Sequence, residues 1–264
     1  ESQLIDNPPQ ADVYMTGSDQ GWGPVADGTY DSAYFLSFAK GRKVSYATSF
    51  DHTKITNELQ EYYKKWLSSY DYISAREDNV VQILSNIGID AEQVIDPTLM
   101  LDAMNWDKIV KPIKHKDYIL VYQLHSDNRL NEYAQKVAAK TGKKIIRVSP
   151  LLHQIIRLGK FVWCPEVGAF LSYIKNAACV ITDSFHGTAF SINFNVPFVD
   201  VFHNEINPRI MSILKLTGLT NRVLTDDQNV DLALEKIDFT QANAALVKER
   251  ERCNKILASM IEGN

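Results

Sequence analysis

The chain has 264 residues, of which 45% are hydrophobic and 23% charged, as is ordinary for a globular protein of one large domain or two small ones. Its formal net charge of −4 argues against a general nucleic-acid binder, which normally presents a basic face. No apolar run reaches the length of a membrane span, and the first residues lack the pattern of a signal peptide.

Short apolar runs alternate with amphipathic runs along the chain. Strands are expected at residues 11–16, 43–48, 70–75, 93–96, 118–124, 144–149, 179–182 and 197–202. Helices are expected at residues 56–70, 77–88, 129–142, 166–177 and 187–195. Because strands rich in Val and Ile alternate with helices, the pattern predicts an α/β protein with parallel sheets.

The segment 99–117 interrupts this alternation and predicts the join between two Rossmann-like halves. The expected domains are 1–110 and 111–238, followed by a long helix within 239–264. A terminal helix of that length is expected to pack across the outside of the protein. The first half is one surface against which it can pack.

The three cysteines, Cys164, Cys179 and Cys253, form neither a CxxC pair nor a metal-binding spacing. This pattern favours a reduced, cytoplasmic compartment, and no metal site is expected. The basic run "KIVKPIKHK" (108–116) is interpreted as a solvated linker rather than a phosphate-binding patch.

The stretch "VITDSFHGTAF" places polar residues between an expected strand and an expected helix. Ser184 or Asp183 suits the N-cap, and the first-turn N–H groups would favour an anion there. His186 can exchange a proton near neutral pH, and Gly187 leaves room for a ligand near the backbone. The alternative is a capped helix whose histidine satisfies a buried backbone group.

A second polar loop, "YMTGSDQGWGP" (14–24), also follows an expected strand. Ser18, Asp19 and Gln20 offer polar groups for a ligand, and a plain capped loop is the alternative. Trp22 suits core packing better than stacking on a sugar, although sugars do stack on indole rings.

A third loop, "YDYISARED" (70–78), places Arg76 between a strand and a helix. An arginine at this position can bind a phosphate or carboxylate through two nitrogens, or it can pair with Glu77 or a neighbouring aspartate as a structural bridge. The sequence leaves both open.

The sequence contains no GxGxxG, GxxxxGK[ST], GxSxG or HExxH motif, so the signatures of dinucleotide-binding, P-loop, hydrolase and zinc-protease functions are absent.

Several blocks together resemble the polysaccharide pyruvyl transferase family. They are "VYMTGSDQGWGP", "YFLSFAKGRKVSYATSF", "YISAREDNVVQIL", "VIDPTLML", "PEVGAFLSYIKNAACVITDSFHGTAFSI" and "NPRIMSILKLTGLTNRV". The likeness spans roughly residues 12 to 225, and the order of so many blocks makes it specific.

The resemblance implies a GT-B-like fold of two Rossmann-like domains with the active site in the cleft between them. It also implies transfer of the enolpyruvyl unit of phosphoenolpyruvate to two hydroxyls of one sugar, forming a cyclic ketal and releasing phosphate. His186 matches the family's histidine before glycine, Asp19 its first-domain acidic loop, and Arg76 its arginine after the third strand.

Two features depart from the family pattern. Many members carry an arginine at the position of Ser184, so Arg209 is the candidate cation for the donor. Members also usually begin with a further β-α unit, and the first domain here is expected to be truncated at its N-terminus.

The residues and the resemblance together give a hypothesis for the site. His186 and Asp19 are the expected catalytic residues. The donor is expected at Ser184, Gly187, Thr188, Arg209 and Arg76, and the acceptor at Ser18, Gln20 and Trp22. No cofactor or metal is expected beyond phosphoenolpyruvate as co-substrate.

The expected partners are a small-molecule donor and a saccharide or lipid-linked saccharide acceptor, with no nucleic acid. The setting implied by the family is exopolysaccharide or cell-surface polysaccharide biosynthesis in the cytoplasm, with peripheral membrane contact and oligomeric state left open. Two alternatives stand beside this one: a nucleotide-sugar-dependent GT-B glycosyltransferase and a non-catalytic sugar- or phosphate-binding module.

Overall fold

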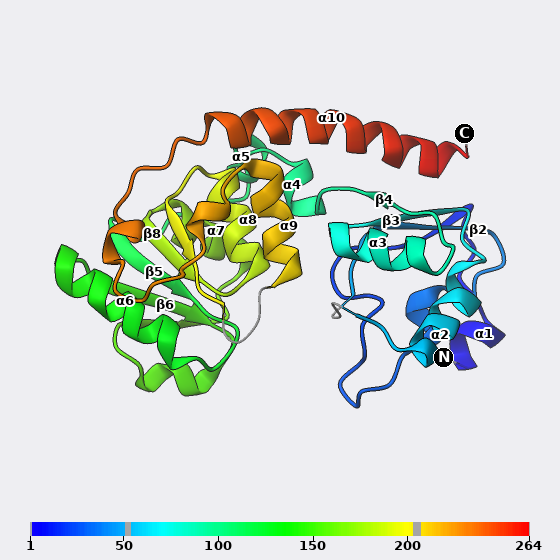
Figure 1. Cartoon of the computed structure of the whole chain (residues 1–264), viewed down its shortest axis with the longest axis horizontal. Coiled ribbons are helices and arrows are strands. Elements are labelled where there is room, and N and C mark those ends of the chain that lie inside the picture. Colours follow the sequence, from blue (N-terminus) through cyan, green and yellow to red (C-terminus); the bar gives the residue numbers. More distant parts are fainter. Residues whose placement is uncertain (1, 51–53, 203–206, 264) are drawn as a thin grey trace. The chain divides into compact units, whose positions relative to one another are not determined.

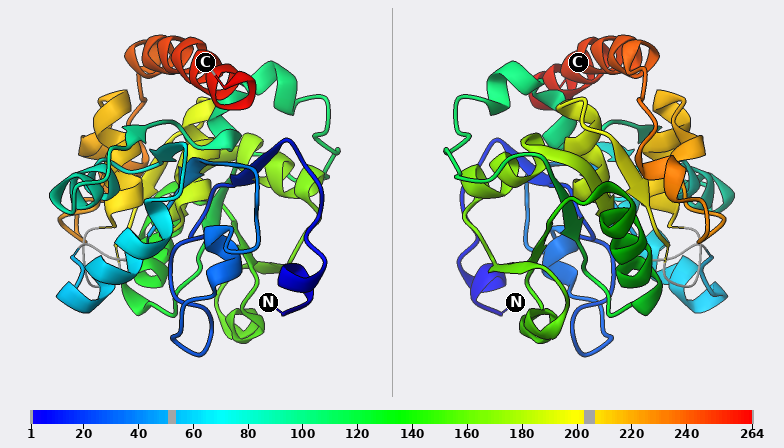
Figure 2. Two further views of the ribbon diagram at one scale, coloured as in Figure 1. Left: turned by 90° about the vertical axis from the view of Figure 1, so that its right-hand side faces the viewer. Right: turned by 90° about the vertical axis from the view of Figure 1, so that its left-hand side faces the viewer.

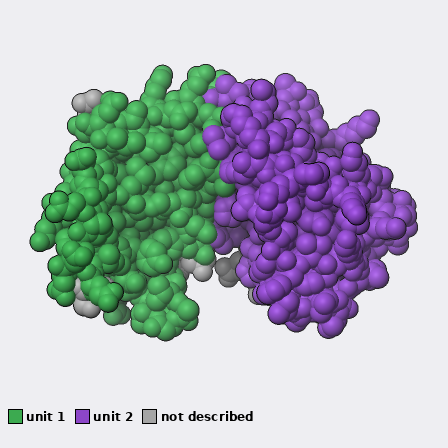
Figure 3. Space-filling view, turned by 180° about the vertical axis from the view of Figure 1, so that it is seen from behind, with its two compact units in different colours: residues 1–100, 248–264 green, residues 101–247 purple. Residues whose placement is uncertain are grey.

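A computed structural model describes residues 2–50, 54–202 and 207–263. The chain divides into two compact units, which are coloured separately in Figure 3. Unit 1 comprises residues 1–100 and 248–264, and unit 2 comprises residues 101–247. The domain ranges 1–110, 111–238 and 239–264 derived from the sequence remain predictions.

Unit 1 is built on a parallel sheet in the order β1-β2-β3-β4 (Figure 1). Its strands are β1 (Val13–Thr16), β2 (Arg42–Thr48), β3 (Tyr72–Ala75) and β4 (Glu92–Gln93). Its helices are α1 (Ser2–Asp6), η1 (Ser32–Phe35), α2 (Asn57–Leu67), α3 (Asp78–Asn86) and α4 (Pro97–Met100). Helices α2 and α3 are the cyan and teal helices at the left of the left-hand view of Figure 2.

The core of unit 1 is rich in aromatic rings. Trp22 is fully buried, and its ring is stacked with Phe35 at a centroid distance of 6.2 Å and tilted against Phe50 at 5.7 Å. Phe50 also stacks on Tyr63 of α2 at 4.4 Å, and the Tyr63 hydroxyl donates to the Trp22 carbonyl at 2.8 Å. This cluster fixes the loop after β1 against α2.

Unit 2 is built on a parallel sheet in the order β7-β6-β5-β8-β9. Its strands are β5 (Tyr118–Tyr122), β6 (Ile145–Ser149), β7 (Lys160–Trp163), β8 (Ala177–Thr182) and β9 (Phe198–Asp200). Its helical segments are α5 (Ala103–Trp106), α6 (Asn128–Thr141), η2 (Leu152–Ile156), α7 (Val167–Lys175), α8 (Phe185–Asn193), α9 (Pro208–Thr217), η3 (Thr220–Arg222) and η4 (Val230–Ala233). The prediction of an α/β fold with parallel sheets is confirmed.

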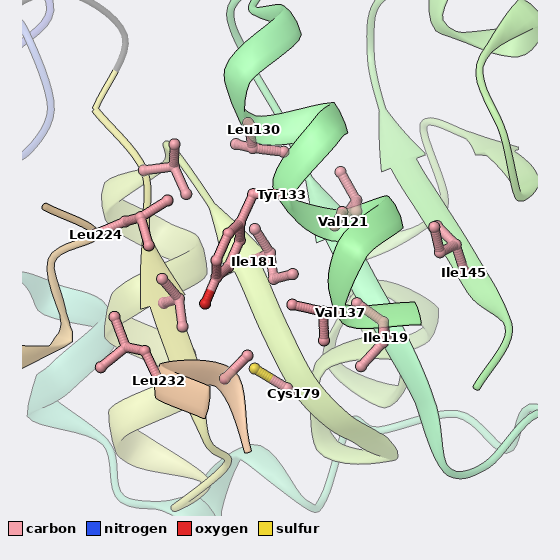
Figure 4. Packing of buried hydrophobic residues seen from close by; sticks show 14 residues of the cluster. Ile119, Val121, Leu130, Tyr133, Val137, Ile145, Cys179, Ile181, Leu224 and Leu232 are labelled. Carbon is pink, nitrogen blue, oxygen red and sulfur yellow. The ribbon is translucent and has the colours of Figure 1, made fainter. Parts of the chain in front are cut away.

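Helices cover both faces of this second sheet. Leu130, Tyr133 and Val137 of α6 point toward Val121 of β5 and Ile181 of β8, as Figure 4 shows. Residues of the opposite strand face contact α7 and α8, among them Tyr122, whose ring packs on Phe170 at 4.8 Å. Sandwiched in this way, the strands read as continuous apolar runs, which is why the sequence predicts them well.

Strand β7 was not predicted from the sequence. It is an edge strand of only four residues, whose ends Lys160 and Trp163 are exposed and whose middle residues are only partly buried. Gly159 precedes it with a φ of +112°, a conformation that favours glycine, and a Cβ there would collide with Ile145.

The C-terminal helix α10 (Thr240–Glu262) belongs to unit 1 from Lys248 onward. Arg252 binds Glu92 Oε1 at 2.7 Å and the Gln93 carbonyl at 2.6 Å, at the end of the sheet. Arg42 of β2 donates to the Met260 carbonyl at 3.0 Å. Among the described residues, no helix combines the length and the apolarity that a membrane crossing would need.

Candidate functional site

The turn between β8 and α8 lies at the carboxyl edge of the unit 2 sheet, where parallel α/β sheets bind ligands. Ser184 is the N-cap of α8, with extended φ and ψ of −104° and 130°. Its Oγ accepts from the Gly187 N–H at 3.5 Å, and its own N–H donates to Thr182 Oγ1 at 3.0 Å. Of the two caps the sequence allowed, the structure selects Ser184.

His186 lies in the first turn of α8 and is half-buried. Its ring contacts Phe185 edge-to-face at a centroid distance of 5.4 Å. The imidazole is therefore placed at the positive end of the helix, at the edge of the sheet where ligands are expected.

Gly187 has a structural reason to be glycine. A Cβ at this position would collide with Thr182 Oγ1, which donates to the Tyr122 carbonyl at 2.7 Å. Helix-on-strand packing therefore requires glycine here, and the expectation that Gly187 leaves space for a ligand stays a prediction.

Thr188 does not offer its hydroxyl to a ligand, which corrects its assignment to donor binding. The residue is fully buried, and Oγ1 lies 2.5 Å from Asp200 Oδ1 and 3.1 Å from the Ser184 carbonyl. Burial raises the pKa of Asp200 to about 8, against the opposing effects of Thr188 and Arg222. Asp200 Oδ2 has no hydrogen-bond partner within the described residues.

Asp183 connects the turn after β8 to the loop after β5. Its carboxylate accepts from the Leu124 N–H at 2.7 Å, and from the N–H and Nδ1 of His125, each at 3.0 Å. The Asp183 side chain is 4% exposed and the His125 side chain 55% exposed. Sequence reasoning missed His125, because only its position shortly after an expected strand could have indicated it.

Arg76 forms the structural bridge that the sequence left open as an alternative. Its side chain is 2% exposed and donates to Glu77 Oε1 at 2.9 Å and to Asp96 Oδ2 at 2.7 Å. The third contact is with Asp19 Oδ1 at 3.4 Å. All three guanidinium nitrogens therefore face carboxylates of unit 1, and the predicted donor contact of Arg76 gains no support.

Asp96 holds this network together and was not among the predicted site residues, because its partners Arg76 and Ser18 lie 20 and 78 positions away along the chain. Burial by itself would raise the pKa of Asp96, but the Arg76 charge and bonds from Thr98 hold that pKa below its usual range. Asp96 Oδ2 also accepts from Ser18 Oγ at 2.7 Å, so the predicted acceptor residue Ser18 is tied to the same carboxylate.

The rest of the loop after β1 divides into exposed and buried parts. Asp19 has a φ of 72°, its side chain is 63% exposed, and Gln20 beside it is half-buried. Trp22 is fully buried beneath its aromatic neighbours, as the sequence favoured, so the indole offers no face to a sugar and its assignment to acceptor binding gains no support. The roles of Asp19 and Gln20 stay predictions.

Arg209 lies in the first turn of α9, whose N-cap Asn207 accepts from the Arg209 N–H at 3.0 Å. The residue is half-buried, and α9 packs against α8. The structure thus places Arg209 in the unit that contains His186, while its donor contact remains a prediction. The part of the chain that is described contains no group of three or more His, Cys, Asp or Glu residues able to hold a metal ion.

A family model described as polysaccharide pyruvyl transferase matches residues 3–204, which include the loop after β1, the Arg76 network and the β8–α8 turn. The chain belongs to the polysaccharide pyruvyl transferase family. The resemblance inferred from the sequence blocks is thereby confirmed, and this chain is a member of a transferase family. A search of curated proteins finds no match.

Solved structures of similar fold include UDP-N-acetylglucosamine 2-epimerases. The enzyme from Rickettsia bellii is 14% identical with a TM-score of 0.57, and the match covers 99% of this chain and 76% of that one. The enzyme from Methanocaldococcus jannaschii, in complex with UDP-GlcNAc and UDP, is 16% identical with a TM-score of 0.54, over 97% of this chain and 78% of that one. At such identities the likeness shows the GT-B-like α/β fold alone.

Proposed function

We propose that this pyruvyl transferase family member uses phosphoenolpyruvate to build a pyruvate ketal on two hydroxyls of a sugar, with release of phosphate. The observation that carries the proposal is the family match over residues 3–204, which contains the capped β8–α8 turn with His186 in its first turn. A saccharide or lipid-linked saccharide acceptor and a role in cell-surface or exopolysaccharide biosynthesis form part of the proposal. A cytoplasmic location fits the three free cysteines.

The donor phosphate is proposed to bind at the first turn of α8. Backbone N–H groups and the helix dipole favour an anion at a helix N-terminus. Arg209 is the proposed partner of the donor carboxylate, because Arg76 already faces three carboxylates. Ser18 and Gln20 of unit 1 are proposed to bind the acceptor, and Asp19 between them is a proposed catalytic residue.

His186 is proposed to protonate the methylene carbon of phosphoenolpyruvate. Protonation makes the central carbon electrophilic, so that a sugar hydroxyl adds to it. A second hydroxyl then displaces phosphate and closes the ring. General acid catalysis of this kind contributes about 10²- to 10⁴-fold to the rate.

Two measurements test the proposal. Phosphoenolpyruvate, and not UDP-GlcNAc, should raise the melting temperature, since a ligand that binds only the folded state stabilises it. Incubation with phosphoenolpyruvate and methyl hexosides bearing a free 4,6-diol should release phosphate and yield a ketal by mass spectrometry. His186→Ala should keep the fold and lose about 10²-fold or more of turnover, whereas His153→Ala, the matched control, should not.

Other results would support the alternative functions. Stabilisation by UDP-GlcNAc alone would favour a nucleotide-sugar enzyme. Stabilisation by phosphoenolpyruvate without release of phosphate from any acceptor would favour a binding module. Near-normal turnover of His186→Ala would reject the role of this histidine.

A further inference from the structure

Two imidazoles follow adjacent strands of the unit 2 sheet. β5 and β8 pair in parallel up to Tyr122 and Thr182, the last residues of the two strands. His125 comes shortly after β5, and His186 shortly after β8. Because the carboxyl ends of parallel strands meet at one edge, both histidines belong to the edge at which ligands bind.

Asp183 orients the first of these imidazoles. Its buried carboxylate accepts from His125 Nδ1 at 3.0 Å, and it is itself held by the Leu124 and His125 N–H groups. A carboxylate only accepts, so Nδ1 carries the proton and the lone pair of the neutral ring lies on Nε2. The ring is 55% exposed while the carboxylate is 4% exposed. A buried acid behind a solvent-facing imidazole is the arrangement that holds a histidine ready to accept a proton.

If the protein forms a ketal as proposed above, its active site needs two groups that exchange protons with the substrates. In the addition step a hydroxyl loses its proton as its oxygen bonds to the central carbon, while the methylene carbon gains a proton. In the closing step the second hydroxyl loses its proton as its oxygen bonds to the same carbon. At the same time the carbon–oxygen bond to phosphate breaks, and the leaving phosphate takes the bonding electron pair and a proton. Each step therefore needs a proton donor and a proton acceptor at different atoms, and one imidazole cannot be both.

We propose that His125, positioned by Asp183, is the partner of His186 in these transfers. In the addition step His125 Nε2 accepts the hydroxyl proton while His186 donates one to the methylene carbon. In the closing step His125 returns its proton to the leaving phosphate while His186 accepts one from the second hydroxyl. Both rings end in their starting protonation states, so the cycle balances with no other reactant. The assignment rests on the proposed function.

A matched control lies on the same edge of the sheet. His153, in η2 after β6, is an exposed histidine whose Nε2 lies 2.7 Å from Ser126 Oγ rather than from a carboxylate. His125→Gln should lower kcat by about 10²-fold or more, with the KM for phosphoenolpyruvate within about threefold, whereas His153→Gln should leave kcat unchanged. Both variants replace exposed side chains, and equal melting temperatures would verify that they fold.

The imidazole tautomer gives a readout that a purely structural role of Asp183 would not change. Long-range ¹H–¹⁵N spectra of the whole chain should show neutral His125 protonated on Nδ1. Asp183→Asn should lose this tautomer and lower kcat. Should that substitution displace the loop, His125→Gln still decides the role of the ring.

The outcomes separate the two proposals. If the wild type forms ketal and His125→Gln keeps its kcat, the assignment of His125 is overturned and the proposed function stands. If the wild type releases no phosphate from phosphoenolpyruvate with any acceptor, both fall. A dominant Nε2–H tautomer in the wild type would overturn the positioning role of Asp183.

Discussion

Asp200 should make the protein less stable as the pH rises, and replacing it with asparagine should remove that dependence. The carboxyl is fully buried, and burial raises its pKa from 3.8 to about 8. At neutral pH Asp200 therefore keeps its proton and can donate to Thr188 Oγ1, which leaves the Thr188 hydroxyl to donate to the Ser184 carbonyl. An asparagine amide can make the same donation in the same space.

The sign follows from proton counting. Between the unfolded pKa near 4 and the folded pKa near 8, the native state binds one proton more than the unfolded state. Each pH unit in this window should therefore cost the wild type up to about 1.4 kcal/mol of its free energy of unfolding. Over the whole window the limit is about 6 kcal/mol, and Asp200→Asn should be spared that loss.

Urea unfolding followed by circular dichroism, between about pH 5 and pH 7.5, measures the difference between the two proteins. The free energy of unfolding of Asp200→Asn, relative to wild type, should grow steadily with pH. Hydrogen exchange of the β8 amides should show that this difference arises in unit 2. Asp231→Asn, at a carboxylate that is 69% exposed, is the control and should show no such trend. A difference between Asp200→Asn and wild type that stays constant with pH would refute the reasoning.

Three further substitutions test the packing around the candidate site. Gly187→Ala should lower the free energy of unfolding by about 1–3 kcal/mol, measured by urea unfolding, because its Cβ meets Thr182; no loss would contradict that packing. Arg76→Ala should cost about 3–5 kcal/mol by leaving the buried Asp96 unpaired, and Arg76→Lys should recover only part; full recovery would argue against the three-carboxylate network. Trp22→Ala should cost about 3–5 kcal/mol in calorimetry, and an unchanged melting temperature would place the indole outside the core.

Local patterns were sufficient for most of the unit 2 sheet and for the cap of α8. Strands such as 118–122 and 177–182 are covered on both faces, so their apolar runs identify them, and Ser184 stands where a helix needs a cap. β7 escaped prediction because its apolar run, residues 161–163, is only three residues long and belongs to an edge strand with exposed ends. The sequence favoured core packing for Trp22, but its partners Phe50 and Tyr63 lie far along the chain and could not be named from it.

The contacts that shape the candidate site also join residues that lie far apart in the sequence. Arg76 meets Asp96 across 20 positions, and His125 meets Asp183 across 58. A single sequence does not show which residues contact each other. Arg76 was therefore left with two possible roles, and no role was predicted for His125. The pairing comes from the parallel order of the strands, which brings the loops after them to one edge.

Three consecutive residues fix the turn that carries His186. Thr182 donates to the Tyr122 carbonyl, Asp183 binds the loop that contains His125, and Ser184 caps α8. Both imidazoles are thus anchored to adjacent strands of unit 2, and their spacing is set within one packed unit. A preorganised proton donor and acceptor lower the cost of orienting the reacting groups. Substitutions in the β8–α8 turn should therefore act on kcat, whereas changes at the proposed acceptor residues Ser18 and Gln20 of unit 1 should act on which sugar is used.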